Sequence, residues 1–163
     1  MGKRLDGYYP TDPYATDALR AFLARRYPSS LRESWIDPCA GYGGLLEALL
    51  IPPHLREAIE QEPRHRQELL RRVPTGRIGD GLTLPWPAVN VGMNPPFDND
   101  LMVAFVRRAL VHQERTGGLI CCLALATFWH SDAMRTRGAG SVARPSSSCQ
   151  TSGSAATAPA AAT

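Results

Sequence analysis

The distribution of apolar and polar residues predicts alternating strands and helices along most of the chain. Short apolar stretches predict strands at 34–36, 56–60, 77–80 and 89–93, and a longer run at 118–126 predicts a fifth strand buried on both faces. Helical spacing and capping signals predict helices at 13–26, 45–50, 63–72 and from Asp98 or Asn99 to about Glu114. This alternation predicts an α/β fold, an open and mostly parallel sheet with helices on both faces.

Two loops with unusual residues follow predicted strands. One runs from Asp37 to Gly44 after the first strand, and the other runs from Asn94 to Phe97 after the fourth. In open parallel sheets, ligands bind outside the carboxyl ends of the strands. We therefore expect both loops to face one crevice.

The composition of the chain changes near residue 138. Residues 139–163 consist mainly of Ala, Ser, Thr and Pro, and they hold almost no bulky apolar side chain. Such a segment cannot bury enough surface to offset the entropy cost of folding. The sequence therefore predicts a folded domain at 1–137 and a disordered low-complexity tail at 138–163.

Charge and cysteine content narrow the class of protein only slightly. The 163 residues carry a net charge of +3, and Lys3 is the sole lysine, so arginine supplies nearly all the positive charge. Arginine suits phosphate binding, although a GC-rich genome would give the same bias. The four cysteines lack metal-binding spacing. No signal peptide or membrane span is recognisable, which predicts a cytoplasmic protein.

The segment Asn94-Pro95-Pro96-Phe97 is the most specific chemical signal in the chain. Its prolines remove two backbone donors and fix two φ angles, and Pro95 pushes Asn94 into an extended conformation. The resulting stiff loop presents an amide oxygen, a proline carbonyl and an aromatic ring. These groups can accept the two N–H bonds of an exocyclic amine and stack on the planar molecule that carries it.

The segment Asp37-Pro38-Cys39-Ala40-Gly41-Tyr42-Gly43-Gly44 lies between a predicted strand and a predicted helix. Glycine lets the backbone approach a ligand closely, and the helix amino terminus adds positive potential. The segment lacks the Gly-Lys-Ser/Thr of a phosphate-binding loop and the third glycine of the dinucleotide fingerprint. Taken alone, it fits a tight structural turn as well as a binding loop.

Together the two segments resemble the class I S-adenosylmethionine-dependent methyltransferases, and more narrowly the adenine-N6 DNA methyltransferases of phages and bacteria. The family's cofactor loop has the form Asp-Pro-x-x-Gly-x-Gly, which Asp37, Pro38, Gly41 and Gly43 match. The resemblance covers residues 8–130. It implies a Rossmann-like sheet, S-adenosylmethionine as cofactor, and methyl transfer to the N6 amine of adenine in DNA.

The resemblance also implies cofactor contacts for five further positions. Glu60 would hold the ribose hydroxyls with Gln61 beside the adenine, Asp80 would accept from the adenine amine, and Ala40 belongs to the cofactor loop. The segment around Thr11 resembles the one that closes over the methionine end of the cofactor. Plainer alternatives exist: a solvated carboxylate for Glu60, a turn for Asp80, and a helix cap by Thr11 or Asp12 for the first segment.

The same resemblance implies the catalytic roles of the Asn-Pro-Pro-Phe segment. Asn94, which also borders the cofactor, and the Pro95 carbonyl would accept the two amine protons, Pro96 would stiffen the loop, and Phe97 would stack on the base. Positioning and electrostatics would then favour in-line transfer. A duplex base would have to be flipped out, at a cost of roughly a few kcal/mol. No metal is expected, because the four histidines are scattered.

Other functions fit the same motifs. Asn-Pro-Pro-aromatic also occurs in methyltransferases that act on RNA bases or on a protein glutamine, and the chain could be a non-catalytic remnant that only binds the cofactor. The family sheet has two further strands after the fifth, and residues beyond 137 do not resemble strands. We therefore expect a fold that lacks the last strands.

Overall fold

The computed structural model describes residues 11–124. Its five strands form one parallel sheet in the order β3-β2-β1-β4-β5. The strands are β1 (Trp35–Asp37), β2 (Arg56–Glu60), β3 (Arg77–Ile78), β4 (Asn90–Met93) and β5 (Ile120–Cys122). The helices are α1 (Pro13–Arg26), α2 (Gly44–Ala48), α3 (Arg66–Arg72) and α4 (Asn99–Thr116). The predicted domain boundary and the tail at 138–163 lie outside the described residues.

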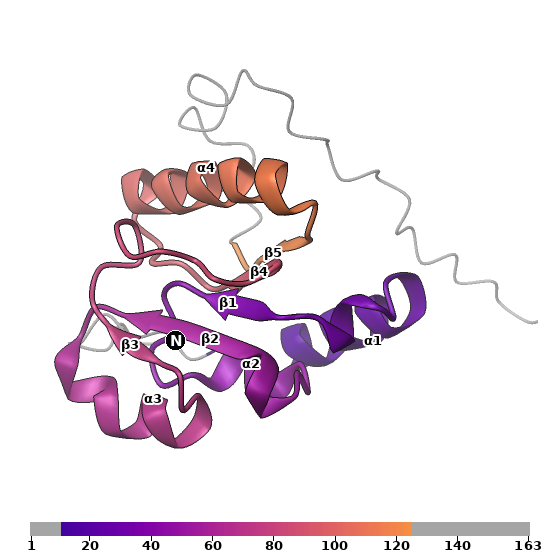
Figure 1. Cartoon of the computed structure of the whole chain (residues 1–163), viewed down its shortest axis with the longest axis horizontal. Coiled ribbons are helices and arrows are strands. Elements are labelled where there is room, and N and C mark those ends of the chain that lie inside the picture. The colour runs from indigo at the N-terminus through magenta and orange to yellow at the C-terminus, as the bar shows by residue number, and fades with distance from the viewer. Residues whose placement is uncertain (1–10, 125–163) are drawn as a thin grey trace, which may run out of the picture.

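Helices cover both faces of the sheet, as predicted. Figure 1 shows α4 on one face and α1, α2 and α3 on the other. Successive side chains of a strand point to opposite faces of the sheet, so neighbouring residues pack against different helices. Trp35 packs with Leu23 and Leu46 on the side of α1 and α2, whereas the adjacent Ile36 packs with residues of α4 such as Met102.

Local capping residues determine where the two longest helices begin and end. The Asp12 carboxylate accepts from the backbone N–H of Tyr14 at the start of α1. Asp98 does the same for α4, and Gly117 ends that helix with a left-handed φ of 69°. The predicted single helix at 63–72 is instead a 3₁₀ turn, Pro63–His65, followed by α3.

The prediction of a fully buried fifth strand was wrong. Residues Ile120–Cys122 are only partly buried, and their side chains pack against the core from its margin. The cause is the position of β5, which within the described residues pairs only with β4. Among residues 11–124, no helix is both long enough and apolar enough to cross a membrane.

Candidate functional site

A cavity of about 670 Å³ lies at the carboxyl end of the sheet. Residues that end or follow β1, β2, β3 and β4 line it together with the start of α1. It therefore brings both unusual loops to one crevice. The predicted site residues that line it are Thr11, Asp37, Pro38, Ala40, Gly41, Glu60, Gln61, Asp80, Asn94, Pro95 and Pro96.

Two predicted site residues, Gly43 and Phe97, do not line this cavity. Gly43 has a left-handed φ of 78° and precedes α2, and a Cβ at this position would meet Leu69 at 3.2 Å and Val73 at 3.3 Å. Its lack of a side chain thus serves the packing of the loop on α3. Phe97 is 39% exposed, so its ring is at the surface.

The glycine loop is folded back on itself and anchored to β2. The backbone N–H of Ala40 donates to the carbonyl of Ile59 at 3.0 Å, and the N–H of Gly43 donates to the carbonyl of Ala40 at 2.8 Å. Gly41 adopts a φ of 55°, which favours glycine. This conformation directs the Gly41 N–H to the Glu60 carboxylate.

Glu60 is the central acceptor of the site. Its Oε2 accepts from the Gly41 N–H at 2.6 Å, and its Oε1 accepts from the Glu62 N–H at 2.8 Å. The residue is only 9% exposed. The solvated-carboxylate alternative for Glu60 is therefore wrong, because burial and two backbone donors hold this carboxylate at the cavity wall.

A second buried carboxylate, Asp37, ends β1. Its Oδ1 accepts from the backbone N–H of Cys39 at 3.1 Å, and the Cys39 thiol lies 3.6 Å from the same oxygen. Burial raises the pKa of Asp37 from 3.8 to about 7, the Cys39 hydrogen bonds oppose this rise, and the nearby charge of Glu60 adds to it. The cavity therefore carries two buried acidic groups, Asp37 and Glu60, that favour a cation or a hydroxyl donor.

The Asn-Pro-Pro segment forms another part of the wall. Asn94 follows β4 directly, and its Nδ2 donates to the Thr11 hydroxyl at 3.3 Å. Pro95 is buried, whereas Pro96 is exposed. The segment before α1 thus lies against the loop after β4.

Asp80 stabilises a turn and also lines the cavity. Its Oδ1 accepts from the Leu82 N–H at 2.8 Å, and its carbonyl accepts from the N–H groups of Thr83 and Leu84. The turn alternative for Asp80 is therefore present in the structure. Asp80 also lines the cavity, so the turn determines where this residue lies at the cavity wall.

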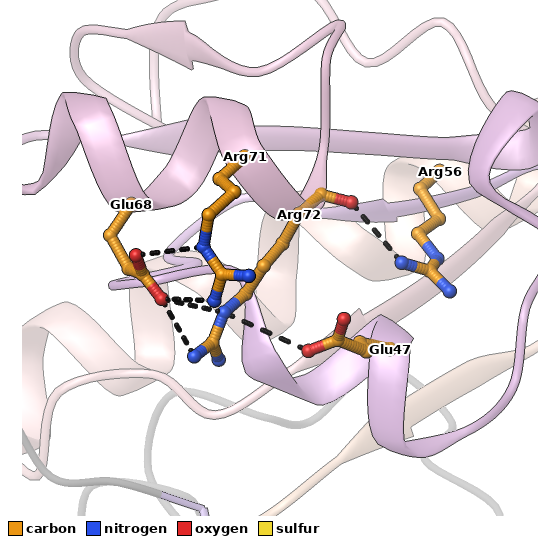
Figure 2. Close-up of polar contacts among 5 residues, drawn as sticks. All are labelled: Glu47, Arg56, Glu68, Arg71 and Arg72. Atoms are coloured by element: carbon orange, nitrogen blue, oxygen red, sulfur yellow. Dashed lines mark hydrogen bonds and ion pairs between the residues drawn. The ribbon is translucent and has the colours of Figure 1, made fainter.

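Charged side chains of α2 and α3 lie close together (Figure 2). Arg72, which also lines the cavity, lies 2.8 Å from Glu68 within α3 and 3.7 Å from Glu47 of α2. Arg71 binds the same Glu68 at 2.7 Å, and these arginines lower the pKa of Glu68 to about 2. The network connects α3 to α2, the helix that follows the glycine loop.

His65 is a cavity residue that sequence reasoning missed. It is buried, it lines the cavity, and its Nδ1 lies 3.3 Å from Glu60 Oε1. No motif marked this position, because the contact depends on the 3₁₀ turn Pro63–His65 that follows β2. Within the described residues, no group of three or more His, Cys, Asp or Glu side chains could hold a metal ion.

Comparison with known proteins identifies the fold. No protein-family model matches the sequence, and no curated protein matches it significantly. A proposed class I S-adenosylmethionine-dependent methyltransferase from Listeria monocytogenes matches with a TM-score of 0.59 and 15% identity, over 83% of this chain and 52% of its own. A proposed RNA methyltransferase from Pyrococcus horikoshii matches with a TM-score of 0.55 and 20% identity, over 75% of this chain and 66% of its own.

These structures define the class of fold to which the chain belongs. Its parallel sheet with helices on both faces is the Rossmann-like fold found in methyltransferases, as predicted. The chain spans 52% and 66% of the lengths of these two neighbours. At such identities the likeness concerns the fold, so activity and substrate have to be argued from the site.

Proposed function

We propose that the chain is an S-adenosylmethionine-dependent methyltransferase that acts on the exocyclic N6 amine of adenine in DNA. One observation carries this proposal. The Asn94-Pro95 segment and the Glu60 carboxylate, which come from different strands, line the same cavity as the glycine loop. An amine-recognising segment and a hydroxyl-recognising carboxylate therefore face one ligand space.

The chemistry of the cavity fits S-adenosylmethionine. Its volume of about 670 Å³ lies in the range of small-molecule sites. Asp37 and Glu60 supply buried carboxylates, which suit the sulfonium and ammonium charges and the ribose hydroxyls of this cofactor. Gly41 has no Cβ to obstruct close approach. When bound, the cofactor would supply the electrophilic methyl group.

The residues of the chain would act mainly by positioning. An aryl amine is a poor nucleophile because its lone pair is delocalised into the ring. Asn94 Oδ1 and the Pro95 carbonyl, by accepting its two protons, would favour a pyramidal nitrogen with an available lone pair. The amine nitrogen would take the methyl group that the bound cofactor supplies, with the carbon–sulfur bonding electrons staying on sulfur, and the nitrogen would release one proton to water.

The polymer that carries the amine is assigned from the sequence motifs rather than from the cavity. The Asn-Pro-Pro-Phe segment is suited to recognise an amine on a planar group, and RNA bases also carry such an amine. A protein glutamine is a third option. The DNA assignment rests on the combined form of the Asp-Pro-x-x-Gly-x-Gly and Asn-Pro-Pro-Phe segments.

The deciding experiment measures transfer of labelled methyl from S-adenosylmethionine to unmethylated DNA, RNA and protein in parallel. We expect N6-methyladenine in DNA from the unaltered chain and none from Asn94→Ala. Gln113→Ala, which removes an exposed amide that does not line the cavity, should retain activity. Label only in RNA or protein would replace the substrate assignment. Folded chain that neither binds the cofactor nor transfers label would overturn the proposal and indicate an inert remnant.

A further inference from the structure

His65 has the environment of a residue that acts through another side chain. It is 3% exposed and lines the cavity, although it belongs to neither of the two motifs. The 3₁₀ turn Pro63–His65 returns the chain toward the end of β2, and the His65 N–H donates to the Glu62 carbonyl at 3.1 Å. This turn places the imidazole beside Glu60.

The imidazole of His65 makes a polar contact with the Glu60 carboxylate. Nδ1 lies 3.3 Å from Glu60 Oε1. This distance is within ion-pair range but the contact is outside hydrogen-bond geometry, and the tautomer with its proton on Nδ1 turns that N–H dipole toward the carboxylate. The imidazole therefore offsets part of the cost of burying the carboxylate.

Two backbone N–H groups also donate to Glu60, and His65 is the third group in contact with this carboxylate. The Gly41 N–H holds Oε2 and the Glu62 N–H holds Oε1, so the backbone contributes one donor to each oxygen. The imidazole approaches Oε1 from a separate segment. It adds a constraint on the carboxylate plane, which determines where the remaining lone pairs point.

The imidazole also contacts the glycine loop. The rings of His65 and Tyr42 have centroids 4.4 Å apart and planes inclined by 57°. Tyr42 lies between Gly41 and Gly43, so His65 links the loop to the carboxylate that accepts from it. Aromatic contacts of this kind favour one relative orientation.

We propose that His65 is a positioning residue that orients Glu60 to receive the vicinal hydroxyls of a ribose. This inference rests on the proposed function, since the ribose is that of the cofactor. His65 does not touch the reacting methyl group. Its loss therefore weakens cofactor binding and leaves the rate at saturating cofactor unchanged.

The test compares four single variants in binding of S-adenosylhomocysteine by calorimetry. His65→Phe keeps a ring against Tyr42 but removes Nδ1, and His65→Gln places its amide at the Nε2 position. Both should bind on the order of tenfold more weakly, as expected when a buried carboxylate loses a polar contact. His65→Asn places an N–H near the Nδ1 position and should retain most of the affinity. His112→Phe is the matched control, because His112 is equally buried but bonds to the Ala88 carbonyl outside the cavity.

Two further readouts separate positioning from general destabilisation. In the active chain, His65→Phe should raise KM for S-adenosylmethionine with kcat unchanged. Without any ligand, hydrogen exchange at the Gly41 and Glu62 amides should become faster in His65→Phe but not in His112→Phe. This second readout does not depend on the cofactor.

The outcomes are distinct. Equal affinities of His65→Phe, His65→Gln and the unaltered chain would overturn the positioning role while leaving the proposed function standing. A comparable loss in His65→Asn or in His112→Phe would also overturn it, because the effect would then be structural. Failure of the folded, unaltered chain to bind either cofactor form would overturn the proposed function, and the ribose role of His65 with it.

Discussion

The amide of Asn94 donates to the hydroxyl of Thr11 at 3.3 Å, although 83 residues separate the two in the sequence. The contact uses the amide nitrogen, so it sets the direction in which the amide oxygen points. Thr11 is the residue before the Asp12 cap of α1. The segment that enters the first helix thereby controls the orientation of the side chain proposed to accept from the target amine.

Thr11→Val should impair methyl transfer more than it impairs folding. The substitution keeps the shape of the side chain but removes the acceptor that orients Asn94. Misplacement of a positioning group costs on the order of ten- to a hundredfold in rate. Single-turnover transfer to DNA measures this loss. Thr75→Val is the control, because Thr75 is exposed, its hydroxyl donates to the Arg56 carbonyl, and neither residue lines the cavity. Equal rates for the two variants would contradict the role of Thr11.

Glu60→Gln should weaken cofactor binding strongly. The amide keeps the size of the side chain, but it removes the charge and replaces one acceptor oxygen with a donor opposite a backbone N–H. Loss of charged acceptors facing two backbone amides and two ribose hydroxyls should reduce affinity by about a hundredfold or more. Calorimetry with S-adenosylmethionine measures the change.

Glu57→Gln is the matched control for Glu60→Gln. Glu57 lies on the same strand, is partly buried and does not line the cavity. Its substitution should leave cofactor affinity unchanged. Similar losses in the two variants would indicate that β2 is perturbed as a whole and would argue against a specific role for Glu60.

Most of the fold could be predicted because its signals are local. The apolar stretch before Asn94 and the Asp98 cap predict β4 and the start of α4 correctly, and the helix at 13–26 has the predicted bounds. The failure at Ile120–Cys122 has a non-local cause. An apolar run reports only that a strand can be buried, whereas its exposure depends on how many strands lie beside it.

The candidate site was predictable where a strand ends in a loop with restricted chemistry. Asp37, Gly41, Glu60 and Asn94 follow or end strands, and parallel pairing necessarily brings such positions to one edge. His65 was not predictable in this way. Its place beside Glu60 depends on a short turn, and no periodic pattern encodes that turn.

Asp37 should make stability depend on pH with a defined sign. Its pKa is raised from 3.8 to about 7 by burial, so the native state retains a proton that the unfolded chain releases. The stabilisation that this retained proton gives the native state is fully present below pH 3.8, and it is lost as the pH rises through about 7. Asp37→Asn cannot lose this proton, and its stability relative to the unaltered chain should therefore increase over that range by on the order of a few kcal/mol. Urea denaturation at several pH values measures the difference, and parallel profiles would contradict the assignment.

Arg56 should be a determinant of stability rather than of binding. Its buried guanidinium donates through Nε to the Ile51 carbonyl at 2.6 Å and through Nη1 to the Arg72 carbonyl at 3.1 Å, the second of which is drawn in Figure 2. It thereby satisfies a carbonyl at the end of α3 and ties β2 to the segment after α2. Arg56→Met keeps the aliphatic bulk but leaves both carbonyls without this donor.

We expect Arg56→Met to lower the free energy of unfolding by about 2–4 kcal/mol, because buried acceptors that lose a charged donor bear their full desolvation cost. Arg71→Met is the matched control on the neighbouring surface, since Arg71 is exposed and pairs only with Glu68 in its own helix among the described ion pairs. It should change stability little. Denaturant titration of both variants measures the two effects. Cofactor affinity should be the same in both, because neither Arg56 nor Arg71 lines the cavity. A loss of affinity in Arg56→Met without a loss of stability would contradict this division of roles, because it would connect Arg56 to the ligand rather than to the packing of α3 on the sheet.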